Sequence, residues 1–309
     1  MDIEVVICTH NRERLIKKVI ASLNNCSLPE KTNISILVLA NACSDNTHAF
    51  LNEYQTKQKA NNLLPLQWNA VPKPGKSHAL NYAIPKLQGD LIAMIDDDHR
   101  ISENYFAVLA DAFNKYKEVG IFFGKILPDW TGKEPKWAHL QGKYAIYPLP
   151  VPHFDKGDES FEYHDKVATP GGGNLALRRE VFNKVGDFNT ELGPEGHNLG
   201  GGEDSDFVKR AISIGIKLRY LPDMVQYHYV DPERFKFSYI LTKSFQRSRS
   251  VALISKKEIT RVPNFIWKKL FVYFFSTIFS FNIDKSRFYT VRLAAALGEL
   301  SAYRKLSGK

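Results

Sequence analysis

Asp90-Leu91-Ile92-Ala93-Met94-Ile95-Asp96-Asp97-Asp98 is the stretch that decides the fold. Its unbroken run of apolar residues is typical of a strand that is buried on both faces, as in the sheet of an α/β protein. Three carboxylates follow directly at the end of this strand. Because ligands of parallel sheets bind beyond the carboxyl ends of the strands, the stretch predicts both a central strand and one side of a binding site.

Earlier segments alternate between strand and helix patterns in the same way. Apolar runs at 4–8, 34–40 and 66–69 alternate with helical patterns at 11–23, 47–59 and 78–87. This alternation predicts βαβ units and a mostly parallel sheet flanked by helices. The loops at 8–12, 41–45 and 96–98 would then meet at one edge of the sheet. We therefore expect one shared site there.

The second half of the chain carries two glycine clusters. One cluster, 171–173, precedes a predicted strand, and the other, 200–202, precedes Glu203 and Asp204 at the start of a predicted helix. Short strands are expected at 218–221 and 225–229, the second of which contains His228. Residues 127–168 are rich in Pro, Trp, Tyr and His without periodicity, and we expect loops over the active site there.

The acidic run suggests a metal site. Asp96 and Asp98 are spaced so that two carboxylates can converge on a cation, and such oxygen ligands suit Mg²⁺ or Mn²⁺. A diphosphate leaving group needs such a cation to neutralise its charge. A neutral imidazole at His228 would be a suitable further ligand. The alternatives are an acidic run that caps a helix and a histidine that is simply packed in a sheet.

The position of Glu203 and Asp204 at a helix start also has two interpretations, a catalytic one and a structural one. A carboxylate at a helix start, next to glycines that allow a ligand to approach, can act as a general base toward a sugar hydroxyl. Acidic residues are also common helix N-caps because they complement the helix dipole. Lys76 and Arg12 could contact phosphate or a nucleotide base, or could be ordinary solvated loop charges.

Taken together, these motifs resemble the inverting family 2 glycosyltransferases over about residues 3–234. The matching segments are Val6–Arg12, Asn41–Thr47, Gly75–Asn81, the DxD motif in Ile95–Asp98, Gly172–Arg179 and the ED motif in Gly202–Asp204. The resemblance implies a GT-A (Rossmann-like) catalytic domain at 1–235, with a donor half at about 1–100 and an acceptor half at about 101–235. It also implies an enzyme that transfers a sugar from a nucleotide-diphospho-sugar to a hydroxyl acceptor.

The resemblance also assigns roles to individual residues. The donor-binding set is Thr9, Asn11, Arg12, Asn41, Asp45, Lys76, Asn81, Asp96 and Asp97. Asp98 with His228 would hold Mn²⁺ or Mg²⁺, Asp204 with Glu203 would supply the base, and the acceptor side would include Gly172, Gly173 and Asn174. The family often has an acidic residue that contacts uracil at the position of Ala40. The resemblance implies UDP as the first expectation for the donor nucleotide, but because Ala40 lacks that carboxylate, GDP and dTDP stay open.

Two other functions are compatible with parts of this pattern. A nucleotidyltransferase also uses a parallel sheet and metal-binding carboxylates, but it would normally carry an early glycine-rich phosphate loop, and Thr9–Arg12 contains no glycine. A non-catalytic carbohydrate-binding or scaffold protein would be expected to lack Asp98 or Asp204, and both are present.

Cysteine content and the N-terminus favour a cytoplasmic protein. The three cysteines have no CxxC or metal-finger spacing, which is typical of a reducing compartment. The acidic start Met1–Glu4 does not resemble a signal peptide. No zinc finger, basic zipper or RNP-type motif indicates nucleic-acid binding.

The C-terminal part, 236–309, is expected to form a basic helical tail. Residues 234–309 hold 16 Lys and Arg against 3 Asp and Glu, whereas residues 1–233 hold 26 basic and 30 acidic side chains. The aromatic-rich segment Phe265–Phe281 contains Lys268 and Lys269 and is only just long enough to span a bilayer. We therefore expect a helix lying in the plane of the inner face of the cell membrane. Together with this tail, the family resemblance implies a lipid-linked or surface/exopolysaccharide glycan as acceptor. The alternative is a helix packed on the catalytic domain or a dimer partner.

Overall fold

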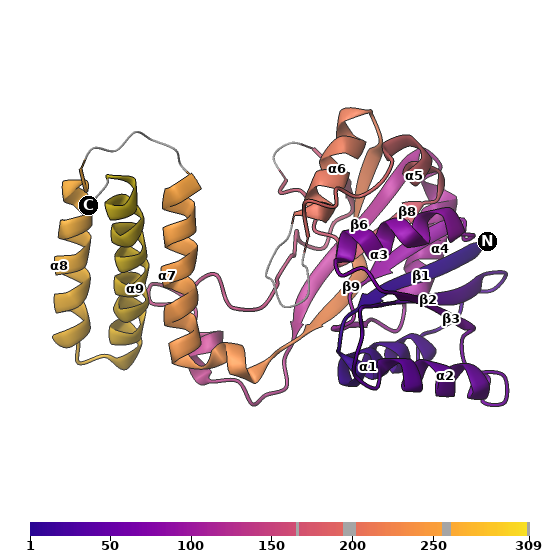
Figure 1. Ribbon diagram of the computed structural model, residues 1–309, viewed down its shortest axis with the longest axis horizontal. Coiled ribbons are helices and arrows are strands. Elements are labelled where there is room, and N and C mark those ends of the chain that lie inside the picture. Colours follow the sequence, from indigo (N-terminus) through magenta and orange to yellow (C-terminus); the bar gives the residue numbers. More distant parts are fainter. Residues whose placement is uncertain (165–166, 194–201, 255–260, 308–309) are drawn as a thin grey trace. The chain divides into compact units, whose positions relative to one another are not determined.

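The structure is a computed structural model that describes residues 1–164, 167–193, 202–254 and 261–307 (Figure 1). Gly200 and Gly201 of the second glycine cluster lie outside these residues. The chain divides into two compact units. Unit 1 comprises Met1–Asp129 and Pro152–Tyr229, and unit 2 comprises Trp130–Val151 and Val230–Lys309.

Unit 1 is an α/β domain. Its strands are β1 (Asp2–Thr9), β2 (Asn33–Asn41), β3 (Leu66–Val71), β4 (Leu91–Ile95), β5 (His99–Ile101), β6 (Val119–Asp129), β7 (Phe161–Glu162), β8 (Asn174–Arg178) and β9 (Lys217–Tyr229). Its helices are α1 (Glu13–Asn24), α2 (Thr47–Lys57), α3 (Lys76–Ala83), η1 (Ile84–Lys86), α4 (Tyr105–Lys115), α5 (Glu180–Val185) and α6 (Glu203–Ser213). The strands and helices expected in the first 100 residues are all present.

All nine strands belong to one sheet, in the order β3-β2-β1-β4-β8-β6-β9-β5, with β7 paired to β9. The first four strands of this order are parallel, as expected from the βαβ pattern. Beyond β4 the sheet is mixed, because β8 runs antiparallel to both β4 and β6 while β6 and β9 are parallel to each other. The fold class is therefore the expected α/β class, with antiparallel pairings confined to its second half.

The sheet carries a hydrophobic core on each face because its central strands are apolar on both sides. In β4, Leu91, Ala93 and Ile95 contribute to one core, and Ile92 and Met94 contribute to the other. Helices α1, α2 and α4 cover the first face, and α3, α5 and α6 cover the second. Figure 1 shows α1 and α2 on the opposite side of the sheet from α3 and α6. This packing fixes β4 and the acidic run that follows it.

The strand candidates at 218–221 and 225–229 are parts of the single strand β9. The register with β6 shifts at this point, since Gly124 pairs with Leu221 and Lys125 pairs with Val225. A β-carbon on Gly124 would lie 1.9 Å from the Met224 carbonyl oxygen, so only glycine fits beside this bulge. The bulge lets one strand continue to His228.

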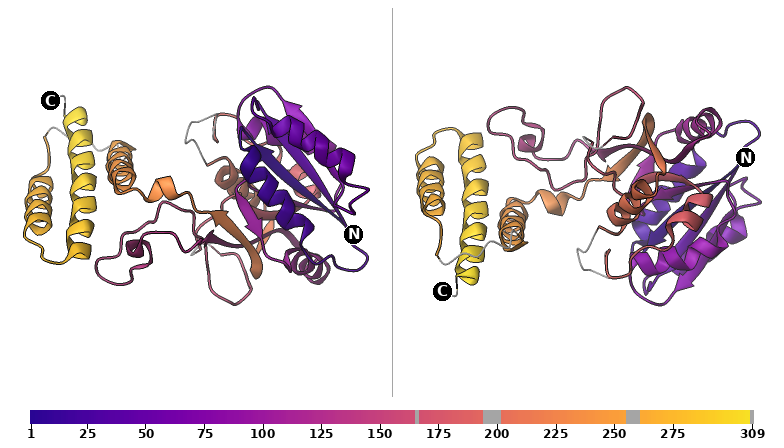
Figure 2. Two further views of the ribbon diagram at one scale, coloured as in Figure 1. Left: turned by 90° about the horizontal axis from the view of Figure 1, so that it is seen from below. Right: turned by 90° about the horizontal axis from the view of Figure 1, so that it is seen from above.

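Unit 2 is built from helices. It contains η2 (Lys136–His139), η3 (Pro232–Phe235), α7 (Phe237–Ile254), α8 (Asn264–Ile278) and α9 (Ile283–Leu306). Helix α9 packs against both α7 and α8, and Figure 2 shows the three helices side by side. Gly298 of α9 lies directly against the backbone of Phe245 of α7. Across the residues that the structure describes, none of the helices is both long and apolar enough to cross a bilayer.

Candidate active site

The acidic run lies in the turn that joins β4 to β5. Asp96 to Asp98 leave the central strand, and the chain then enters β5 at His99. Strand β5 pairs antiparallel with β9, and the register places His99 directly opposite His228. Directly opposed side chains on paired strands are neighbours on one face of a sheet. This pairing therefore brings two histidines to the end of the DxD motif.

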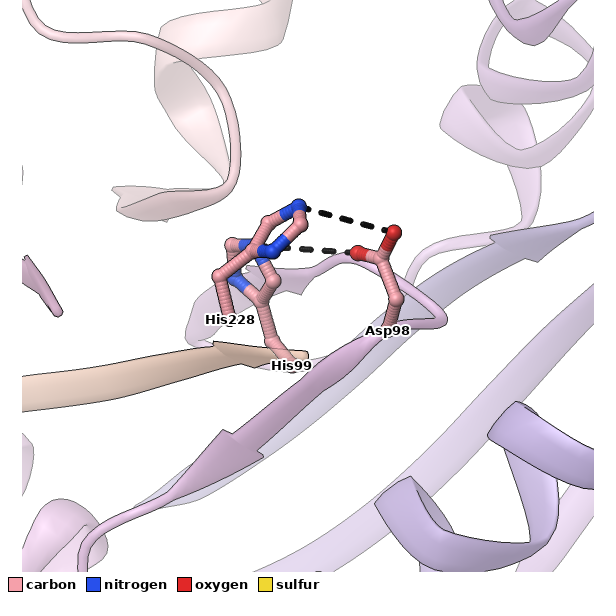
Figure 3. Close-up of side chains that lie close together, drawn as sticks. All are labelled: Asp98, His99 and His228. Carbon is pink, nitrogen blue, oxygen red and sulfur yellow. Dashed lines mark ion pairs between the residues drawn. The ribbon is translucent and has the colours of Figure 1, made fainter. Parts of the chain in front are cut away.

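Asp98, His99 and His228 form a cluster that could hold a metal ion (Figure 3). One ligand atom from each of these side chains lies within 4.8 Å of the other two. Asp98 Oδ1 is 3.7 Å from His99 Nε2, and Asp98 Oδ2 is 3.6 Å from His228 Nε2. Both histidines are buried. Among the described residues this is the one group of three or more His, Cys, Asp or Glu side chains whose donor atoms lie close enough to hold a cation, and it contains the predicted pair Asp98 and His228.

Arg12 lies at the same acidic run. Its Nη1 atom donates to Asp97 at 2.8 Å and to Asp98 at 2.9 Å. Burial raises the pKa of Asp97 to about 6, although the Arg12 guanidinium and the nearby Thr9 hydroxyl oppose this shift. The guanidinium balances the charge of the acidic run and, being half-exposed, can also reach solvent.

Lys76 connects the DxD motif to the ED motif. From the start of α3, its Nζ atom lies 3.1 Å from Asp96, 3.5 Å from Glu203 and 3.3 Å from Asp204. Burial alone would lower the pKa of Lys76, but the three carboxylates raise it well above its ordinary value. Lys76 is therefore a fixed cation that holds motifs from two distant parts of the sequence together.

Asp204 is a buried carboxyl group with one oxygen engaged. Its Oδ2 atom contacts Lys76, whereas its buried Oδ1 atom has no hydrogen-bond partner among the described residues. Burial raises the pKa of Asp204 to about 7, and the Glu203 carboxylate adds to this shift while Lys76 opposes it. A buried acceptor without a partner is costly, and such atoms are often found where a ligand binds. The arrangement suits a group that accepts a proton near neutral pH.

Gly172 and Gly173 provide the space that these carboxyl groups occupy. A β-carbon on Gly172 would lie 1.9 Å from Asp204 Cγ. A β-carbon on Gly173 would lie 2.8 Å from Asp96 Oδ2 and 2.7 Å from His99 Cε1. Both predicted glycines therefore border the site, and a side chain at either position would displace a site residue.

The side-chain amides of three predicted site asparagines form hydrogen bonds within the protein. Asn41 binds backbone atoms of Val71, Lys73 and Gly75. Asn81 exchanges two hydrogen bonds with the backbone of Phe188. Asn174, almost fully buried, uses both amide atoms inside the sheet. These amides hold the loops around the site, and their direct contact with donor or acceptor stays a prediction.

The two remaining predicted residues shape the first two loops. Asn11 has a positive φ of 52° and accepts hydrogen bonds from the backbone of Ser44 and Asp45. Asp45 in turn accepts the backbone N–H groups of Glu13 and Thr47, the first residues of α1 and α2. One carboxylate thus accepts one of the open N–H groups at the N-terminus of each of two helices. The loops that were predicted to bind the nucleotide are therefore braced against each other.

Comparison with known families agrees with this geometry. Residues 4–186 match the model of glycosyl transferase family 2, which covers more than half of the chain. The chain belongs to glycosyl transferase family 2. This is a family of glycosyltransferase enzymes, and the resemblance expected from the motifs is confirmed. Residues 152–231, which surround the ED motif, also match the model described as the N-terminal domain of galactosyltransferase.

Individual relatives of this family 2 member are distant. A probable glycosyltransferase of Bacillus subtilis, YdaM, is 23% identical over 76% of this chain, and the match covers 52% of YdaM. The succinoglycan biosynthesis protein ExoM of Rhizobium meliloti is 20% identical over 81% of this chain and 74% of ExoM. The chain thus spans about half the length of YdaM and three quarters of ExoM.

Solved structures share the GT-A fold. The TarS fragment 1–349 of Staphylococcus aureus, in complex with UDP-GlcNAc, has a TM-score of 0.53 at 14% identity, covering 100% of this chain and 91% of that one. The mannosyltransferase PcManGT of Pyrobaculum calidifontis, in complex with GDP-Man and Mn²⁺, has a TM-score of 0.51 at 16% identity. This match covers 94% of this chain and 73% of PcManGT. At these identities the likeness concerns the fold.

The sequence analysis missed two residues of the candidate site, His99 and Gln226. His99 follows the acidic run directly, and its Nδ1 atom lies 2.7 Å from Oε1 of the fully buried Gln226. The alternation of side chains along β9 could have predicted Gln226, because Gln226 and His228 are two residues apart on one strand and so face the same side. The antiparallel pairing of β5 with β9, which adds His99 to them, had no signal in the sequence.

Proposed function

We propose that this chain transfers a glycosyl group from a nucleotide-diphospho-sugar to a hydroxyl acceptor in a single in-line displacement that inverts the anomeric centre. The observation that carries the proposal is the position of Lys76 between Asp96 on one side and Glu203 and Asp204 on the other. A transferase needs its donor-binding carboxylates and its base in one place. Here one buried ammonium group joins them within unit 1, which we propose is the catalytic unit.

The donor atoms beside Asp98 suit a divalent cation. A carboxylate and an imidazole are ligands of Mn²⁺, and the nearby buried side chains limit access of water. Asp98 and His228 would hold Mn²⁺ or Mg²⁺, which would neutralise the charge that develops on the departing diphosphate. The structural neighbour PcManGT is in complex with Mn²⁺, which supports the assignment. Asp96 and Asp97 would orient the ribose and sugar, assisted by Arg12.

Asp204 is the base in this proposal. Lys76 fixes the orientation of the carboxyl group through Oδ2, and Oδ1 is the atom that would accept the proton of the acceptor hydroxyl. A pKa of about 7 suits this task, because a base near the working pH is both ionised and still basic. Glu203 would tune Asp204 through its own charge.

The donor nucleotide is proposed to be UDP, with GDP and dTDP as alternatives. The neighbours TarS and PcManGT bind UDP-GlcNAc and GDP-Man respectively, so the fold accepts both nucleotides. Thermal melting with UDP, GDP and dTDP, each with and without Mn²⁺, tests the proposal. We expect one nucleotide to raise the melting temperature only when Mn²⁺ is present. Melting temperatures that none of the three nucleotides raises, with or without Mn²⁺, would contradict nucleotide-sugar binding.

The acceptor is proposed to be a lipid-linked or surface/exopolysaccharide glycan at the inner face of the membrane. ExoM, named for succinoglycan biosynthesis, supports a polysaccharide acceptor. The structure of helix α8 supports the proposed binding to a membrane. Its Lys269 side chain faces α9 and pairs with Glu299 at 2.8 Å, and the backbone carbonyl of Thr277 accepts a hydrogen bond from the Ser286 hydroxyl of α9.

The opposite face of α8 is exposed and aromatic. The exposed large side chains of this face and the turn after it are Phe265, Trp267, Phe271, Val272, Phe274, Phe275, Ile278, Phe279 and Phe281. Lys269 of α8 is paired to α9, whereas the exposed Lys268 lies among the aromatic side chains of the outer face. An exposed aromatic face that also carries a basic side chain suits the interface of a membrane. The basic side chains of 234–309 would add attraction to anionic lipid.

A further inference from the structure

The tautomer of His99 is set by a chain of buried hydrogen bonds. Asn174 donates through Nδ2 to two backbone carbonyl groups at 2.7 and 2.8 Å, so its Oδ1 atom is an acceptor. Gln226 donates through Nε2 to that oxygen at 2.9 Å, which leaves Gln226 Oε1 facing His99 Nδ1 at 2.7 Å. Because amide oxygens only accept, Nδ1 of His99 must carry the hydrogen.

The Nε2 atom of neutral His99 therefore presents a lone pair to the acidic run. It lies 3.7 Å from Asp98 Oδ1 and 4.0 Å from Asp96 Oδ2. His228 is arranged in the same way, with Nδ1 2.6 Å from the Tyr229 carbonyl oxygen and Nε2 3.6 Å from Asp98 Oδ2. Lone pairs that face carboxylate oxygens repel one another unless a cation lies among them or both rings are protonated.

Gly173 keeps His99 in this position. A β-carbon there would lie 2.7 Å from His99 Cε1, so only glycine lets the ring lie beside Asp96. The Nδ1–H bond to Gln226 is the kind of second contact that orients metal-binding histidines and fixes their tautomer. A histidine that was merely packed in the core would not need its Nε2 atom to face two carboxylates.

We infer that His99 is a further ligand of the cation proposed for the active site, so that two imidazoles and one carboxylate hold the ion. This inference rests on the proposed function, and it adds a ligand and a metal preference to that site. Imidazole favours transition ions, and the set of two histidines and one carboxylate with open positions is known from such metals. The site should therefore prefer Mn²⁺ over Mg²⁺.

Mn²⁺ binding, measured by electron paramagnetic resonance with and without UDP, tests the inference without any transfer reaction. His99→Gln keeps the volume and polarity of the side chain but removes the imidazole. We expect Mn²⁺ affinity to fall roughly tenfold or more while Mg²⁺ affinity, from competition, changes less than about twofold. The matched control is His153→Gln, because His153 is exposed in unit 1 and should leave both affinities unchanged.

Electron spin-echo measurements on native protein count the imidazole nitrogens bound to Mn²⁺ and do not depend on the folding of a variant. Two bound imidazoles in the native protein and one in His99→Gln are the expected result. One imidazole in the native protein, or unchanged Mn²⁺ affinity in His99→Gln, would overturn the inference while leaving the proposed function intact. If native protein binds no Mn²⁺ with UDP, GDP or dTDP, the proposed metal-assisted function fails and the role of His99 fails with it.

Discussion

Gly172 lies so close to Asp204 that a β-carbon on the glycine would be 1.9 Å from the carboxyl carbon of the aspartate. Atoms that are not bonded cannot approach so closely, and the neighbour is a buried carboxyl group that Lys76 holds in place. We expect Gly172→Ala to displace Asp204 and to lower kcat by about 10²-fold or more, as loss of a positioned base does. The measurement is turnover at saturating donor.

Gly171 provides a matched control for this substitution. A β-carbon at Gly171 would meet no atom within 4 Å, and its φ lies outside the left-handed region. Gly171→Ala should therefore leave turnover and melting temperature unchanged. Full activity of Gly172→Ala would show that the carboxyl group of Asp204 is not needed in its observed position.

Asp204→Asn removes the base but keeps the shape of the side chain. We expect kcat to fall by roughly 10²–10⁴-fold while the affinity for the donor stays within a few-fold of native, because the donor contacts are assigned to other residues. Calorimetric titration with the nucleotide and a single-turnover assay separate the two quantities. A collapse of donor affinity with normal turnover of bound donor would instead make Asp204 a binding residue.

The pH dependence of kcat should report the ionisation of Asp204. A base is active when deprotonated, and burial raises its pKa to about 7, so activity should rise with pH through about 7. The Glu203 charge raises this pKa further, so Glu203→Gln should shift the rising limb to lower pH. The exposed Glu180→Gln serves as control and should not move the limb. A limb that stays fixed in Glu203→Gln would assign the ionisation to another group.

The aromatic face of α8 should bind anionic membranes. Phe271 and Phe279 are each about two thirds exposed, and both pack against Phe275 between them. Replacing both with serine should abolish the salt-resistant part of vesicle binding, since aromatic insertion does not depend on charge screening. Co-sedimentation with anionic vesicles at low and high salt measures this.

Leu28, an exposed apolar residue of unit 1, offers the control for the membrane experiment. Leu28→Ser should sediment with vesicles as the native protein does, and all variants should keep nucleotide binding. Loss of nucleotide binding in the double serine variant would show that this face supports the catalytic unit instead of a membrane.

The position of the acidic run in the candidate site was predictable because local sequence determines it. The apolar run at Leu91–Ile95 is typical of a buried strand, and a chain that leaves such a strand with three carboxylates places them beyond its carboxyl end. The ED motif could be found for a similar reason, since Glu203 and Asp204 begin the regular helix α6. These elements owe little to contacts with distant residues.

The remainder depends on pairings between distant segments. His99 faces His228 only because the three-residue strand β5 pairs antiparallel with β9, and so short a strand leaves no periodic signal. For Lys76 the sequence left a donor contact and an ordinary loop charge both open, because its three carboxylate partners lie 20 or more residues away. The asparagines matched the family motifs, but the sequence could not show that Asn41 and Asn174 bind backbone atoms of neighbouring strands and loops.

The central claim is that Asp98 holds a cation that transfer requires. The most direct measurement is the release of nucleoside diphosphate from nucleotide sugars by native protein and by Asp98→Asn, each in Mn²⁺ and in excess EDTA. Native protein should release the nucleotide of one donor in Mn²⁺, and both EDTA and Asp98→Asn should reduce the rate by at least about 10²-fold, because the charge on the leaving diphosphate is then left without its cation. Undiminished release by native protein in EDTA, or by Asp98→Asn in Mn²⁺, would contradict the account.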